Sequence, residues 1–137
     1  MREGDIMRML LYQPGEAPVE RDVAADQDQL TELLGTSQYE WMTVRFLQIC
    51  VIHDADGKAA GKKLNRLLGK TPLYGDFLVC GIAWDDDGVT DAVALTNQQV
   101  NLVKNVIFDR IPDEDHLDLS LPSYARKKAA ESDGENG

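Results

Sequence analysis

One stretch of the sequence, GDFLVCGI from Gly75 to Ile82, does most to limit the folds open to this chain. Nearly all of its residues are apolar, so a strand formed here has no clear polar face to turn toward water. Strands of this kind are buried on both faces and lie in the interior of a sheet. We therefore predict a central strand at this place in the chain.

Four further strands are predicted before it. Residues 9–12 and 19–23 are short strand-like runs separated by QPGEAP, a loop rich in turn formers, which predicts a hairpin. Residues 39–46 alternate between two faces and contain aromatic and β-branched side chains. Residues 48–53 form a nearly continuous apolar strand that ends in the turn composition DADG. These strands predict a sheet that is either antiparallel or mixed.

Two main helices are marked by the residues at their ends. Asp26 is a good N-cap, leucines recur at helical spacing after it, and Gly35 can end this first helix. Thr96 and Gln99 have the spacing of a capping box at the start of the last helix, which Pro112 ends. We expect both helices to lie on one face of the sheet, which gives an α+β fold.

Length and composition indicate one globular domain. The chain has 137 residues, of which 43% are hydrophobic, and this is enough for one domain with a buried core. We place the domain at residues 7–111 and predict a flexible, disordered polar tail at residues 112–137. No apolar run approaches the ~20 residues that cross a bilayer, and the first residues do not resemble a signal peptide. We therefore expect a cytoplasmic protein without membrane contacts.

The net charge of −10 limits the partners that this chain can bind. A surface that binds nucleic acid must neutralise phosphates with clustered Lys and Arg side chains, so we expect no direct binding of nucleic acid. An acidic surface can instead imitate the charge of DNA and bind a basic protein.

The two cysteines, Cys50 and Cys80, lie in the apolar runs LQICVIH and DFLVCGI. Cysteine is among the most buried residue types, and nothing in the sequence indicates an oxidising compartment. The sequence therefore predicts two free thiols in adjacent core strands. A redox pair is the alternative if these two strands are neighbours, although no CxxC spacing supports it.

Positive charge is concentrated between Lys58 and Lys70. The residues GKAAGKK at the start of this segment lack the spacing and the hydroxyl group of a phosphate-binding P-loop. A simpler anion site, built from glycine N–H groups and basic side chains, remains a reasonable hypothesis, and a solvated basic loop is the alternative. The candidate ligand-binding residues are Lys58, Lys62, Lys63, Asn65 and Arg66.

Asn65 and Arg66 are the most specific part of this hypothesis. Leucines surround them, so a short helical turn is expected to bury the leucines and to hold both polar residues at the rim of a site. A guanidinium fixed in this way binds phosphate or carboxylate through a forked pair of hydrogen bonds. In the alternative interpretation, Arg66 forms an ion pair with an acidic residue such as Asp76, and Asn65 caps a turn.

The sequence offers no pattern for catalysis or for a metal site. His53 is followed by Asp54 and Asp56, but neighbouring residues of a strand point apart, and the DADG sequence is more typical of a plain turn. Cys50 and His53 are expected on opposite faces of their strand, so they do not form a nucleophile and base. We therefore expect a protein that is not an enzyme and that has no metal or cofactor.

The order of elements and several short sequences resemble DUF3846, a family of small bacterial and phage proteins of unknown function. The resemblance extends from Met9 to Phe108 and depends on PG at 14–15, DGK at 56–58, LNR at 64–66, GDFLVCG at 75–81 and LTxxQ at 95–99. Relatives often have a proline ahead of the Asn-Arg pair, where this chain has Lys63 and Leu64. The family brings no activity. It implies an accessory protein of phages or mobile elements and directs attention to Asn65 and Arg66.

Two functional hypotheses follow. The first is a non-enzymatic binding module in which the basic residues hold a small anionic ligand, most plausibly a nucleotide-like molecule, or an acidic protein surface. The alternative is a DNA-mimic or antirestriction-type interaction protein that acts through acidic patches at residues 85–91 and 109–118.

Overall fold

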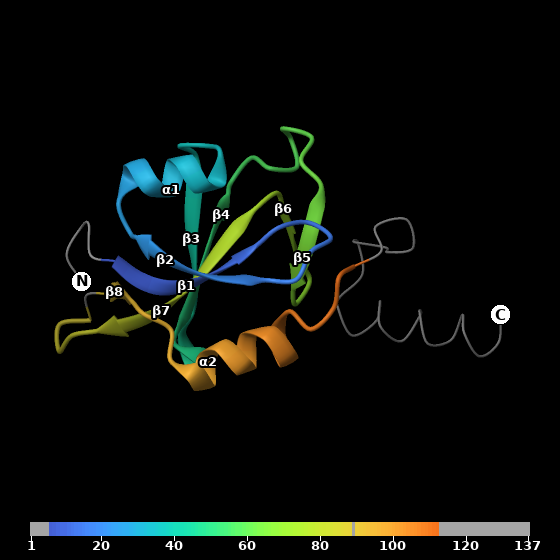
Figure 1. The fold of residues 1–137 in the computed structure, drawn as a ribbon. Helices are drawn as coiled ribbons and strands as arrows, with labels where there is room; N and C mark the ends of the chain where they lie inside the picture. The colour runs from blue at the N-terminus through green and yellow to red at the C-terminus, as the bar shows by residue number, and fades with distance from the viewer. Residues whose placement is uncertain (1–5, 89, 113–137) are drawn as a thin grey trace, which may run out of the picture.

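The fold consists of an antiparallel sheet with a separate two-stranded hairpin beside it and a helix on each side (Figure 1). The computed structural model describes residues 6–88 and 90–112. In chain order the elements are β1 (Ile6–Tyr12), β2 (Val19–Ala24), α1 (Gln27–Leu34), β3 (Tyr39–Val44), η1 (Arg45–Leu47), β4 (Ile49–Asp54), β5 (Leu64–Leu68), β6 (Thr71–Tyr74), β7 (Phe77–Trp84), β8 (Thr90–Val93), α2 (Asn97–Leu102) and η2 (Val103–Ile107). The predicted tail from residue 113 onward lies outside the described residues.

Strand β7 is the centre of the main sheet. The strand order is β2-β1-β7-β4-β3, and β8 also pairs with β7. Every pairing is antiparallel. The first six residues of β7 are buried, which is the burial that its apolar sequence predicts. The predicted central strand, the predicted hairpin of β1 and β2, and the α+β fold are confirmed.

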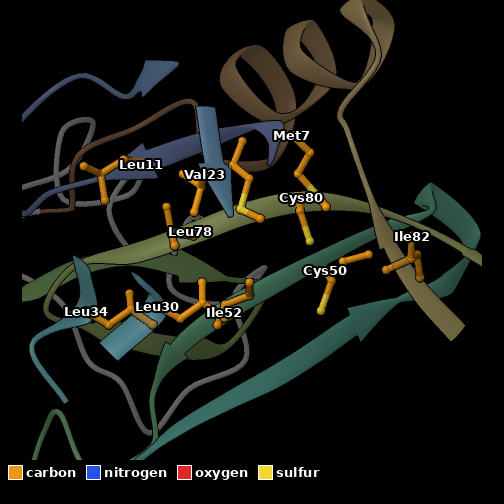
Figure 2. Close-up of a cluster of buried hydrophobic side chains, with 12 residues drawn as sticks. Met7, Leu11, Val23, Leu30, Leu34, Cys50, Ile52, Leu78, Cys80 and Ile82 are labelled. Atoms are coloured by element: carbon orange, nitrogen blue, oxygen red, sulfur yellow. The ribbon is translucent and has the colours of Figure 1, made fainter. Parts of the chain in front are cut away.

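The apolar side chains of the central strands form a core on each face of the sheet. One core contains Leu78 and Cys80 of β7 and is covered by Leu30 and Leu34 of α1, as Figure 2 shows. The other contains Phe77 and Val79 of β7, and the residues that cover it are Val100 of α2, Val103 of η2 and the adjacent Phe108. The expectation that both helices lie on one face is therefore wrong. A strand that is apolar on both faces requires cover on both faces.

Both predicted helix starts are confirmed. The side chain of Asp26 accepts a hydrogen bond from the Gln29 N–H at 2.9 Å, and Gly35 ends α1 with a left-handed backbone at φ 70°. Thr96 and Gln99 form a reciprocal capping box at α2. Among residues 6–88 and 90–112, no helix has both the length and the apolar character needed to span a bilayer.

The two-sided core makes a direct prediction. Leu30→Ala should lower the free energy of unfolding by about 2–5 kcal/mol, and Phe108→Ala by about 3–5 kcal/mol, because each leaves a cavity in a different core. Urea denaturation of the purified variants measures both values. Glu32→Ala, at an exposed position of α1, is the control and should change stability by less than about 0.5 kcal/mol. A negligible effect of either core substitution would mean that the corresponding face is not packed as described.

Candidate functional site

The basic segment begins in the turn that follows β4. Lys58 and Lys63 are exposed, while Lys62 lies against the protein. The Lys62 ammonium forms an ion pair with the buried Asp54 carboxylate at an N–O distance of 2.6 Å. It also donates a hydrogen bond to the Leu34 carbonyl at the end of α1, at 3.3 Å. Lys62 therefore joins β4 to α1, and its charge is largely committed to Asp54.

Asp54 is held in its charged form. Burial disfavours the carboxylate, but hydrogen bonds from Lys62 and from the Asp56 N–H, together with the positive charge of Lys62, outweigh burial and lower the pKa of Asp54. The Asp54 side chain accepts the Asp56 N–H at 2.8 Å. This is the DADG turn predicted from the sequence, and it fixes the start of the basic segment.

The segment containing Asn65 and Arg66 is a strand, and the prediction of a helical turn is wrong. Residues 64–68 form β5, which pairs antiparallel with β6. The two strands are joined at Gly69 and Lys70, and Gly69 has a φ of 62°. A glycine in a two-residue loop between apolar runs is a hairpin signal that the sequence did offer. The helical spacing of the leucines obscured it.

Asn65 is fully buried and acts as a connector between segments. Its side-chain amide donates to the Tyr12 carbonyl at 2.9 Å and to the Gly75 carbonyl at 2.8 Å. One side chain therefore links the end of β1, the strand β5 and Gly75, the residue that follows β6. The sequence predicted that Asn65 lies at the rim of a site, and this prediction is wrong because its side chain is fully buried.

Arg66 is also internal, with only 2% of its surface exposed. One terminal nitrogen donates to the backbone carbonyl and the side-chain oxygen of Asn65, each at 3.0 Å. The other donates to the Glu16 carbonyl, in the loop between β1 and β2, at 2.6 Å. The guanidinium carbon lies 5.1 Å from the centre of the Tyr12 ring, a distance typical of a cation–π contact.

No carboxylate forms an ion pair with Arg66 in the part of the chain that the structure describes. The alternative prediction of an Arg66–Asp76 bridge is therefore wrong as well. Burial lowers the pKa of Arg66, while the Tyr12 phenol acts in the other direction. Burial likewise raises the pKa of Tyr12 to about 12, against the influence of Arg66. Carbonyl oxygens and an aromatic ring stabilise this buried charge in place of a carboxylate.

Two polar atoms beside this cluster remain without a partner. Within the described residues, neither Arg66 Nε nor the Tyr12 hydroxyl has a hydrogen bond, although both are buried. Tyr12 is itself fixed by rings, since it stacks on Phe77 at 4.9 Å and meets Phe108 edge-on at 5.1 Å. With its terminal nitrogens bound to the protein and its surface closed, Arg66 has no face on which to contact a ligand in this conformation.

Glycines let the basic segment approach β6 closely. A Cβ atom on Gly57 would lie 2.6 Å from the Tyr74 carbonyl oxygen, closer than such atoms come in proteins. Gly75 has a φ of 80° and donates its N–H to the Lys63 carbonyl at 2.8 Å. The glycines of the DGK and GD sequences are thus explained by close packing against β6 and by the left-handed backbone at Gly75.

Lys62 and Lys63 line an open pocket of about 740 Å³ at this end of the molecule. Its wall also contains Glu16, Glu32 and Asp76, so acidic groups outnumber basic ones. Burial raises the pKa of Asp76, against hydrogen bonding by Gln13 and the charge of Lys62. The structure therefore places two of the predicted basic residues, Lys62 and Lys63, in one pocket, and Lys58 lies outside it. The carboxylates in the same pocket oppose the binding of an anion.

A different surface carries exposed aromatic and acidic residues together. The hairpin of β7 and β8 ends in Asp85, Asp86 and Asp87, which are all exposed. Trp84 directly precedes them, and the Arg45 guanidinium lies 4.6 Å from the centre of its ring. Phe46, next to Arg45 in η1, has 86% of its surface exposed. We call residues 45–46 and 84–87 the hairpin-tip surface.

An adjoining groove of about 530 Å³ opens over the sheet on the same side as α1. Tyr39, Trp41 and Thr43 of β3 form one part of it. The rest is lined by Ala25, Gln27, Cys50, Ile82, Thr90, Asp91 and Ala92. Sequence analysis missed this groove, because it depends on which strands pair and on how little of this face α1 covers. Trp41, a large aromatic residue that lines the groove, has 44% of its surface exposed.

Comparisons with known proteins bear on the family and on the fold. A family model described as "Domain of unknown function (DUF3846)" matches residues 7–107. The crystal structure of the small RNA methyltransferase HEN1 is similar in fold, with a TM-score of 0.51 and 11% sequence identity. The similarity covers 69% of this chain and 15% of the methyltransferase chain. At this identity it concerns the fold alone. No curated protein sequence gives a significant match.

The internal role of Arg66 is tested by Arg66→Lys. An ammonium cannot reproduce the forked donors, so buried carbonyls lose their partners, at about 1–3 kcal/mol for each unsatisfied group. We expect the free energy of unfolding, measured by urea denaturation, to fall by at least that amount. Arg21→Lys in the exposed part of β2 is the matched control and should be nearly neutral. Equal stability of the two variants would contradict the role given to Arg66.

Proposed function

The chain belongs to the DUF3846 family, a domain of unknown function, and we propose that it is a non-enzymatic accessory protein that binds a basic protein partner. The observation that carries this proposal is the hairpin-tip surface, where exposed aspartates adjoin exposed aromatic rings. This is the DNA-mimic or antirestriction type of interaction.

Electrostatics supports a basic partner. The chain has a net charge of −10, and three consecutive exposed aspartates concentrate part of that charge at the end of a hairpin. Such a surface attracts a positively charged one and repels nucleic acid. Enzymes that act on nucleic acids carry clustered Lys and Arg in their binding grooves. We propose that an enzyme of this class is the partner, with its nucleic-acid groove as the contact.

The aromatic residues supply the apolar part of the contact. Trp and Arg are enriched at the residues that contribute most to protein interfaces, and charged residues surround them. Phe46 and Trp84 supply the rings and Arg45 the cation, while the aspartates form the rim. Phe46 contributes little to the core at this exposure, so its ring is available for an apolar contact with a partner.

The accessory role on a phage or other mobile element is part of the same proposal, since the family resemblance implied it. A gene located among phage or plasmid genes supports this part, and a conserved chromosomal setting in the absence of such genes counts against it. A cytoplasmic location is also part of the proposal, because the proposed partner enzymes act in the cytoplasm.

Neutralising the aspartates tests the interaction. In the triple variant Asp85→Asn, Asp86→Asn, Asp87→Asn, the asparagines retain the side-chain oxygen that accepts the Asp87 N–H in the native turn, at 2.9 Å. The measurement is displacement of a labelled DNA duplex from purified restriction endonucleases and methyltransferases. The wild-type chain should displace the duplex, less effectively as salt rises. The variant should bind at least about tenfold more weakly, which corresponds to about 1.4 kcal/mol.

A matched control separates the hairpin tip from net charge. The variant Asp22→Asn, Asp28→Asn, Glu32→Gln removes the same charge from exposed positions of β2 and α1. It should keep most of the affinity. The acidic tip is not the binding surface if the hairpin variant and the control variant displace DNA equally well. The same conclusion follows if the wild-type chain fails to displace DNA from any enzyme of this class.

A small anionic ligand, such as a nucleotide, is the second candidate. It is favoured by one observation, the pocket that Lys62 and Lys63 both line. The carboxylates in the same pocket count against it. Arg66→Ala does not test this candidate, because that substitution also removes internal hydrogen bonds.

Thermal unfolding with nucleotides tests the second candidate through Lys63→Ala, which removes an exposed charge. A ligand at 100 times its dissociation constant stabilises the folded state by about 2.7 kcal/mol, so the melting temperature should rise visibly. This rise should be smaller in Lys63→Ala, and unchanged in the control variant Lys70→Ala outside the pocket. If no nucleotide shifts the melting temperature of the wild-type chain, the anion site fails.

A further inference from the structure

The two cysteines lie directly opposite each other on neighbouring strands. Cys50 of β4 is paired with Cys80 of β7 in the antiparallel register. Both are buried and free, which confirms the predicted free thiols in adjacent core strands. Their side chains lie on the face of the sheet that α1 covers, as Figure 2 shows. The condition for a redox pair, that the two strands are neighbours, is therefore met.

The backbone spacing at this pair suits a disulfide. Two residues away along both strands, the Ile82 N–H donates to the Gln48 carbonyl at 2.9 Å, so Cys50 and Cys80 also occupy a hydrogen-bonded position of the ladder. Residues at such positions have Cα atoms about 5.5 Å apart. Disulfides usually join Cα atoms separated by about 4.4–6.8 Å. The Cβ atoms of directly opposite residues are about 4.5–5.5 Å apart, whereas a disulfide needs about 3.5–4.5 Å. The two strands must therefore approach each other by roughly 1 Å for the bond to form.

The thiols also interact with each other. A hydrogen bond with Cys80 lowers the pKa of Cys50, burial opposes this, and a hydrogen bond with Thr43 adds to it. The same Cys50 interaction, together with burial, raises the pKa of Cys80. The directions of these shifts make Cys50 the more readily deprotonated of the two thiols, and the thiolate is the form that attacks an oxidant. This is the division of roles found in an attacking and a resolving cysteine.

Cys50 is reachable from one direction. It lines the groove between α1 and the uncovered part of the sheet, together with Thr43 and Ile82. Its residual exposure is 1%, so an oxidant that reaches the thiol must be small. Cys80 is fully buried and is absent from the lining of the groove.

We propose that Cys50 and Cys80 form an oxidisable dithiol, which hydrogen peroxide converts to a disulfide between β4 and β7. In the first step the Cys50 thiolate attacks one peroxide oxygen, the O–O bond breaks, and the released hydroxide takes up a proton to leave as water. Cys50 is then a sulfenic acid. In the second step the Cys80 sulfur attacks the Cys50 sulfur, the S–O bond breaks, and the second oxygen leaves as water with the Cys80 proton. The sum is two thiols and one peroxide giving one disulfide and two waters.

Oxidation of the two thiols would change the groove that Cys50 lines. Cys50 lies in its floor next to Thr43 and Ile82, and a disulfide would fix the distance between the two strands there. The same two strands lead to η1 and to the β7–β8 hairpin. The dithiol stands independently of the proposed partner, since its geometry comes from strand register alone.

The test uses the full native chain. It is treated with a small excess of hydrogen peroxide, and free thiols are titrated and the intact mass measured. We expect both thiols to disappear together, the mass to fall by two hydrogen atoms, and a digest to contain a peptide pair linked through Cys50 and Cys80. Dithiothreitol should restore both thiols. The single variant Cys80→Ala should instead stop at a Cys50 sulfenic acid, which dimedone traps.

The double variant Cys80→Ala, Ile82→Cys is the matched control. It keeps two thiols on the groove side of β4 and β7 but moves one of them from the directly opposite position to a diagonal one, about 7–8 Å away. This variant should gain oxygen without forming an internal link. The proposal is overturned if the folded wild-type chain keeps both thiols, gains only oxygen, or links only between molecules. It is equally overturned if the diagonal variant forms the link as readily.

Discussion

The junction around Asn65 and Arg66 holds together parts of the chain that the main sheet does not join. Asn65 binds the end of β1 and Gly75, the residue after β6, and Arg66 binds the loop between β1 and β2. The β5–β6 hairpin shares no ladder with the main sheet, so these hydrogen bonds are a principal polar connection between them. Burying a guanidinium is costly unless its donors are satisfied. Here carbonyl oxygens and the Tyr12 ring satisfy most of them.

This arrangement changes where binding is to be sought. The junction needs a side-chain amide with two N–H donors at position 65 and a forked cation at position 66. These structural needs account for the Asn65-Arg66 pair without a ligand. The exposed chemistry lies elsewhere, in the aspartates and rings of the hairpin tip and in the groove beside Trp41. Part of the acidic charge of the chain is concentrated at the end of the β7–β8 hairpin.

Much of the fold could be predicted because its signals are local. The caps at Asp26 and Thr96 and the apolar run of β7 each depend on a few consecutive residues. The placement of α2 could have been predicted as well, since a strand without a polar face needs cover on both sides.

The site was harder to predict because its contacts are distant in sequence. Leucines at 64, 67 and 68 favour a helix, but pairing with β6 overrides local preference. Arg66 meets carbonyls that lie as far as 50 positions away, and no pattern near Arg66 indicates them. The groove and the opposed cysteines likewise follow from strand register, which only the assembled sheet defines.

The internal position of Arg66 is tested most directly by hydrogen exchange at its side chain, measured by NMR on ¹⁵N-labelled protein. We expect the Arg66 Nε–H signal to exchange slowly with water and its terminal N–H₂ groups to rotate slowly, because the terminal groups are held by Asn65 and Glu16. The exposed Arg21 serves as an internal reference for fast exchange. If Arg66 exchanged as fast as Arg21, its guanidinium would be open to water, and the internal junction would be contradicted.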